Sequence, residues 1–151
     1  MTLALRVRRE QRAQAALQRG IAEHAAAAEK AEQMDRAVSL QTSARLARER
    51  QIYQGMRGRS FSAREIACVE AELRQLDRAA AALAAQLAAS IRTAETAHRE
   101  VEALRRHFGG LYRARRKWDE LLLLADRRRG ARQALLEELS LSDDSIARLR
   151  S

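Results

Sequence analysis

The sequence predicts an all-α fold, a long two-helix antiparallel coiled-coil hairpin with a C-terminal helical overhang. Three observations support this prediction: a heptad pattern in each half of the chain, a turn signal between the halves, and a composition rich in Ala, Leu and Arg without proline. An interior proline would cost a helix about 3 kcal/mol, so its absence from all 151 residues suits long helices. Two Phe, two Tyr and one Trp are few large side chains for a globular core of this length.

The second helix is predicted over about 63–139. From Ile66 onward, apolar residues recur in strictly alternating steps of three and four, which places them on one side of a left-handed coiled coil. Ser90 is the single polar member of the pattern. The predicted core positions are Ile66, Val69, Leu73, Leu76, Ala80, Leu83, Leu87, Ser90, Ala94, Ala97, Val101, Leu104, Phe108 and Leu111.

The first helix is predicted over about 3–56 by a weaker pattern of the same kind. Its predicted core positions are Leu3, Val7, Leu17, Ile21, Ala28, Ala31, Val38, Ile52 and Met56. Polar residues interrupt this pattern at Gln14, His24, Asp35, Arg45 and Glu49. Because Leu40, Ala44 and Ala47 fit a shifted register, we expect a stutter in the middle of this helix.

A turn is predicted over about 57–62, where two glycines can end one helix and a serine can begin the next. Ser62 and Glu65 have the spacing of a capping box, and Phe61 and Ile66 have that of a hydrophobic staple. A loop this short makes the two helices antiparallel, because the second can bury its apolar stripe only by folding back on the first. Residue i should then face roughly residue 118 − i.

The first helix then runs out near Lys117, so the second helix continues beyond its partner. The heptad pattern continues there through Leu122, Ala125, Leu136 and Leu139. An exposed apolar stripe of this kind indicates a binding surface. Ser140 predicts a break before a short C-terminal tail, 140–151, while Gly109-Gly110 and Gly130 are either bends or glycines tolerated in a continuous helix.

Side chains of the types that catalyse reactions or bind metals are few and widely spaced along the sequence. His24, His98, His107 and Cys68 lack the spacing of a metal site or of a nucleophile with its base, and no phosphate-binding GxxxxGK[ST] loop is present. We therefore predict a non-enzymatic protein without cofactors. No apolar run approaches the roughly 18 to 20 residues that span a bilayer, and no signal peptide is recognisable, so we expect a cytoplasmic protein.

The net charge of +9 is concentrated at one end of the predicted hairpin. Residues 1–19 carry +4 and residues 99–117 carry +5, and antiparallel pairing brings the two segments together. Such a basic end is either a solvated surface or a docking site for an acidic protein, with Trp118 and the leucines at 121–124 as apolar anchors. Nucleic acid is the less favoured partner, because few aromatic side chains lie nearby for stacking on bases.

Together these features resemble the FliJ/YscO family of flagellar and virulence type III secretion systems. The resemblance rests on chain length, two long helices joined near residue 58, arginines close to the N-terminus, and the acidic pairs Glu137-Glu138 and Asp143-Asp144. It implies a central stalk in the hexameric secretion ATPase, analogous to the γ subunit of rotary ATPases, that promotes ring assembly and activity. It also implies contact with the cytoplasmic domain of the export gate and with export chaperones, beside the secretion apparatus at the inner membrane.

The stalk hypothesis predicts a monomer. We expect its partner-binding residues to be Arg6, Arg8, Arg9, Arg12, Arg113, Arg115, Arg116, Lys117, Trp118, Leu121, Leu122, Glu137 and Glu138. Three alternatives remain from the sequence: a structural scaffold that dimerises or forms a four-helix bundle, an arginine-rich architectural nucleic-acid binder, and a dedicated export chaperone.

Overall fold

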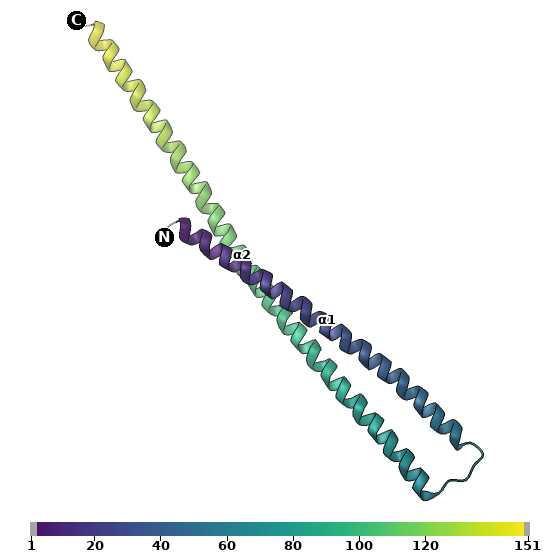
Figure 1. Cartoon of the computed structure of the whole chain (residues 1–151). Coiled ribbons are helices and arrows are strands. Elements are labelled where there is room, and N and C mark those ends of the chain that lie inside the picture. Colours follow the sequence, from purple (N-terminus) through teal and green to yellow (C-terminus); the bar gives the residue numbers. More distant parts are fainter. Residues whose placement is uncertain (1–2, 150–151) are drawn as a thin grey trace. The chain divides into compact units, whose positions relative to one another are not determined.

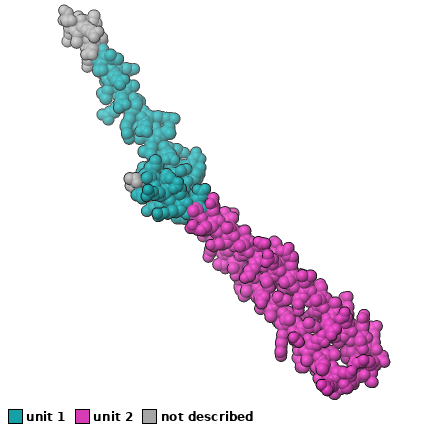
Figure 2. Space-filling model, viewed as in Figure 1, with its two compact units in different colours: residues 1–14, 106–151 teal, residues 15–105 magenta. Residues whose placement is uncertain are grey.

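Two α-helices and one turn make up the chain in the computed structural model, which describes the backbone of residues 3–149 and the side chains of residues 3–142 (Figure 1). Helix α1 spans Leu3–Met56 and helix α2 spans Ala63–Leu149, with no strand in the part of the backbone described. The predicted all-α hairpin is confirmed. The chain divides into two compact units (Figure 2): a turn unit, residues 15–105, and a terminal unit, residues 1–14 and 106–151.

The α2 core positions are confirmed almost throughout. In the turn unit every predicted position from Val69 to Leu104 is buried or half-buried, and Val101 is 2% exposed. In the terminal unit Phe108 and Leu111 are half-buried. Ile66 is the exception at 43% exposed. The strict alternation of three- and four-residue steps therefore identifies the α2 face that packs on α1.

Most predicted core positions of α1 are confirmed: the buried or half-buried ones are Val7, Leu17, Ala28, Ala31, Val38, Ile52 and Met56, and the exposed ones are Leu3 and Ile21. Between residues 13 and 41, however, part of the core lies one residue earlier than expected, beginning with Ala13, which is 6% exposed. Ile21 is exposed, whereas Gly20 is buried. Further half-buried residues on the corrected register are Ala27, Met34 and Gln41, while Gln14 and Asp35 lie on the exposed surface.

Small side chains explain this register. A Cβ atom on Gly20 would lie 2.8 Å from Leu104 Cδ1 and 3.6 Å from Val101 Cγ2, so the two helices approach closely there. Gly and Ala at core positions permit such an approach, although they contribute little to a hydropathy pattern. The shifted register expected in the middle of α1 is wrong, because Leu40 is 72% exposed and Ala44 and Ala47 are also exposed. The 3–4 alternation is instead interrupted by two successive four-residue steps between the half-buried residues Gln41, Arg45 and Glu49.

The pairing of the helices in the turn unit differs from the prediction by about one helical turn. The His24 and His98 rings lie 5.3 Å apart, and Arg45 Nη2 lies 2.5 Å from Asp77 Oδ1, so residue i faces residue 122 − i rather than 118 − i. Helical side chains lean toward the N-terminus of their own helix. Two side chains that touch across an antiparallel pair therefore come from Cα atoms that lie further toward the C-terminus of each helix than the point of contact. The residue numbers of a contacting pair thus add up to more than those of two residues whose Cα atoms are level.

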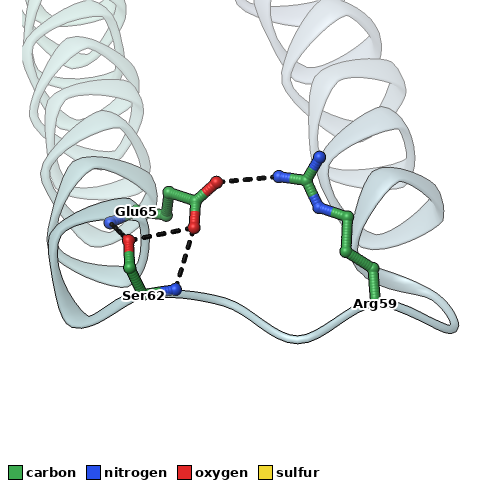
Figure 3. A network of polar contacts seen from close by, with 3 residues as sticks. All are labelled: Arg59, Ser62 and Glu65. Carbon is green, nitrogen blue, oxygen red and sulfur yellow. Dashed lines mark hydrogen bonds and ion pairs between the residues drawn. The ribbon is translucent and has the colours of Figure 1, made fainter.

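The turn holds the predicted capping box (Figure 3). The Ser62 backbone N–H donates to Glu65 Oε2 at 2.8 Å, and the Glu65 N–H donates to Ser62 Oγ at 3.2 Å. Arg59 Nη2 donates to the other carboxylate oxygen of Glu65 at 2.8 Å. Hydrogen bonds from the Ser62 backbone and side chain, with the charge of Arg59, hold the pKa of Glu65 below its usual value. Gly58 supplies the left-handed conformation after α1, with φ +74°.

Phe61, one member of the expected hydrophobic staple, contacts an arginine of the turn. Phe61 lies beneath the Arg59 guanidinium, whose Cζ atom is 4.9 Å from the ring centroid. Its predicted partner Ile66 is exposed. Arg59 thus covers the aromatic ring of the turn and pairs with the capping carboxylate.

Helix α2 does not break at Ser140, because it continues to Leu149. The Ser140 hydroxyl donates to the Glu137 carbonyl at 2.8 Å, and the Ser142 hydroxyl donates to the Leu139 carbonyl at 2.9 Å. Serines that bond back to the preceding turn are compatible with a continuing helix. Gly109, Gly110 and Gly130 also lie within α2, and the Asp143-Asp144 side chains fall outside those described.

Candidate protein-binding surface of the terminal unit

All thirteen residues predicted to bind a partner belong to the terminal unit. Here the first turns of α1 pair with the stretch of α2 from residue 106 to residue 118, and α2 then continues alone. We call residues 119–142 of α2 the overhang. Three features of this unit bear on binding: an anchored tryptophan, a basic patch and an exposed leucine-rich helix.

The tryptophan is held in place by an arginine from the other helix. Arg6 Cζ lies 4.1 Å from the centroid of the Trp118 ring, the distance of a cation–π contact. Trp118 nevertheless remains 45% exposed. A large, oriented and half-exposed indole suits a role as an interface anchor, because its side chain loses little further freedom on binding.

A second cross-helix pair lies one turn further along α1. Arg115 Nε is 3.0 Å from Glu10 Oε2, and the Glu10 side chain is only 12% exposed. The two atoms pair as ions without the alignment of a hydrogen bond, and the Arg115 guanidinium also lies 5.7 Å from the Tyr112 ring centroid. Arg115 is thus engaged within the hairpin. Sequence reasoning missed Glu10, although it is the single carboxylate in residues 1–14.

The remaining basic side chains form an exposed patch. Residues 1–14 and 106–117 together carry a formal charge of +8, in which Glu10 is the single negative group. The exposed members, called the basic patch below, are Arg8, Arg9, Arg12, Arg106, Arg113, Arg116 and Lys117. A charge density of this kind accelerates encounter with an acidic surface and weakens with salt.

The overhang presents its leucines to solvent. Among its side chains none is buried, and only Ala125 is half-buried. Leu121, Leu122, Leu123 and Leu124 are each about half exposed, and the exposed leucines further along are Leu135, Leu136, Leu139 and Leu141. A monomer rarely exposes so much contiguous apolar surface unless a partner covers it.

The predicted acidic pair lies apart from the basic patch. Glu137 and Glu138 are exposed and follow Lys117 by 20 and 21 residues along α2, about 30 Å at 1.5 Å per residue. They therefore form a separate acidic surface of the overhang.

Elsewhere the described side chains offer little reactive chemistry. No group of three or more His, Cys, Asp or Glu side chains within residues 3–142 is placed to hold a metal ion. The tilted contact between His24 and His98 joins two half-exposed or exposed rings across the turn unit. Cys68 is exposed. Among the described residues, no helix is apolar enough over the length needed to cross a membrane.

Comparison with protein-family models, with curated proteins and with solved structures gives no match to this chain. Its function is therefore inferred from the terminal unit itself.

Proposed function

We propose that the chain is a non-enzymatic central stalk of a type III secretion ATPase, which promotes assembly of the ATPase ring and connects it to the export gate and export chaperones. The observation that best supports this proposal is the composition of the terminal unit. It combines a basic patch and an oriented Trp118 with a helix whose leucines remain uncovered. The resemblance to the FliJ/YscO family supplies the kind of partner.

The two units differ in how much of their binding surface is covered, and this difference supports a stalk. The turn unit pairs its own core positions along both helices, so it needs no partner to cover its apolar stripe. The terminal unit leaves charge and apolar surface available at the same time. Long-range attraction by the basic patch would guide docking, and Trp118 with the leucines would supply the short-range contacts.

A stalk of this type acts on its partner's activity rather than through chemistry of its own. The ring would hydrolyse ATP, and the stalk would stabilise the assembled hexamer by binding it in preference to free subunits. Sedimentation of the ATPase with and without the chain tests this. We expect the chain to shift ATPase subunits into hexamers and to sediment with them.

A triple variant tests the basic patch. Replacing Arg8, Arg12 and Arg113 by Glu should weaken binding to the ATPase by about tenfold or more, with a loss of salt dependence. A matched control replaces three exposed arginines of the turn unit, Arg64, Arg78 and Arg92, by Glu. If both triple variants lose the same affinity for the ATPase, the loss is explained by net charge alone, which would contradict a specific role for the basic patch.

A further inference from the structure

The overhang carries a second heptad stripe with basic residues at its centre. Steps of four and three residues connect Leu121, Ala125, Arg128, Arg132, Leu135 and Leu139, which therefore share one side of α2. We call these six residues the Leu/Arg stripe. Leu124 and Leu136 border it on its two sides. Between its end leucines the stripe extends about 27 Å, at 1.5 Å per residue.

The charges of the overhang are sorted by side. Its carboxylates, Asp119, Glu120, Asp126, Glu137 and Glu138, all lie off the stripe by helical spacing. Among the side chains of residues 3–142, no carboxylate pairs with Arg128 or Arg132, whereas neighbouring Arg129 lies 3.9 Å from Asp126. The stripe therefore presents two uncompensated positive charges between two apolar ends.

We infer that the Leu/Arg stripe binds an amphipathic helix of another protein whose apolar face carries acidic residues at its centre. Leucines at both ends of the stripe would pack on apolar residues of that helix, and the central carboxylates would pair with Arg128 and Arg132. Arginine is suited to this role, because its planar guanidinium forms bidentate pairs with carboxylates. The inference concerns this stripe alone and does not require the partner to be an ATPase.

Charge excludes a second copy of the chain as the occupant. The stripe is symmetric about Gly130, so an antiparallel pair of stripes would match Leu121 with Leu139 of the copy. The same pairing sets Arg128 against Arg132 twice, and a parallel pairing sets each arginine against itself. Like charges directly opposed in a helix interface disfavour the complex.

The placement of charge also disfavours a membrane surface. A helix that lies on an anionic membrane has its basic residues on the polar side and leucines alone on the buried side. In the overhang the arginines interrupt the apolar side, and the carboxylates occupy the polar side. We therefore expect the stripe to bind an acidic helix and not anionic vesicles.

Two synthetic peptides test the inference against the full chain. Both have the sequence of residues 117–142; the acidic peptide carries Arg128→Glu and Arg132→Glu, and the basic peptide keeps both arginines. In fluorescence anisotropy we expect the chain to bind the acidic peptide at least about tenfold more tightly than the basic peptide. Equal affinity for the two, or binding of neither, would overturn the inference.

Variants of the full chain show whether the stripe is responsible. Arg128→Glu with Arg132→Glu should reverse the preference, so that the chain binds the basic peptide more tightly. Arg127→Glu changes an arginine that lies off the stripe and should leave the preference intact. No reversal in the double variant would overturn the inference, since a reversal cannot arise from loss of folding.

Self-association and membrane binding are tested directly. Sedimentation equilibrium should show a wild-type monomer. Arg128→Glu alone, which sets the introduced carboxylate of one copy against Arg132 of the other, should produce a dimer. A wild-type dimer dissociated by changes in the stripe, or flotation with anionic vesicles that the double variant abolishes, would assign the stripe to a different occupant. All these assays omit the ATPase, so their failure is distinguishable from failure of the stalk proposal.

Discussion

The close approach of the helices at Gly20 makes a quantitative prediction about the turn unit. A Cβ atom there would lie 2.8 Å from Leu104 Cδ1, closer than ordinary van der Waals contact. Gly110 offers a matched control, because it is exposed within α2 and a Cβ atom there would meet nothing within 4 Å. The two glycines thus separate helix propensity from packing.

At Gly110, alanine should stabilise the protein by up to about 1 kcal/mol, the difference in helix propensity between Ala and Gly. At Gly20 the same gain is opposed by displacement of Leu104, whose rotation off its preferred conformation costs about 0.5–1.5 kcal/mol. Gly20→Ala should therefore be nearly neutral. Gly20→Leu adds three further carbon atoms at the contact and should destabilise the protein by about 1–3 kcal/mol.

Thermal and urea unfolding followed by circular dichroism at 222 nm measures these differences. A double-mutant cycle with Leu104→Ala adds a specific test, because removing the obstructing side chain should recover part of the stability lost in Gly20→Leu. Gly20→Leu as stable as Gly110→Ala, or a cycle without coupling, would refute the close approach.

Three other predictions concern the turn and the terminal unit. Ser62→Ala removes the N-cap of α2 and should lower stability by about 1 kcal/mol in urea unfolding, whereas Ser60→Ala, just outside the cap, should have little effect. Because the pKa of Glu65 is lowered in the folded chain, its carboxylate form stabilises the fold; this contribution is present above the ordinary value of 4.5 and is lost as pH falls through the lower pKa of the folded chain. The thermal midpoint should therefore fall on acidification less steeply in Glu65→Gln than in wild type, and identical slopes would contradict the linkage. Glu10→Ala leaves the Arg115 charge without its partner and should destabilise the terminal unit by about 1–3 kcal/mol. Fluorescence of the single tryptophan, Trp118, reports this loss during unfolding. Adding Arg115→Met to the Glu10→Ala variant should restore part of the lost stability.

How far the fold can be predicted depends on side-chain size. Leu73, Leu83 and Leu104 make the heptad pattern of α2 visible, and its core positions follow directly. Part of the α1 core consists of small residues, among them Ala13, Gly20 and Ala27, that look no more apolar than their neighbours. Hydropathy therefore selects Ile21, while packing selects Gly20, because the helices come closest where the side chain is smallest.

The candidate site was predictable in composition but not in pairing. Counting charges locates the basic segments in residues 1–19 and 99–117. The Arg6 contact with Trp118 and the Glu10 pair with Arg115 depend on which residues face each other. Which residues face each other depends on the direction in which side chains lean along each helix, and this cannot be read from the spacing of residues in the sequence. The helix also continues beyond Ser140, where the serine hydroxyls bond back to the preceding turn instead of ending it.

The stalk proposal is tested most directly by ATP hydrolysis. A purified type III secretion ATPase would be assayed at fixed concentration while this chain is titrated to a several-fold excess. The proposal predicts a saturable rise in hydrolysis per subunit that is lost when Arg8, Arg12 and Arg113 are replaced by Glu. An unchanged rate across the titration, with the ATPase active on its own, would contradict it.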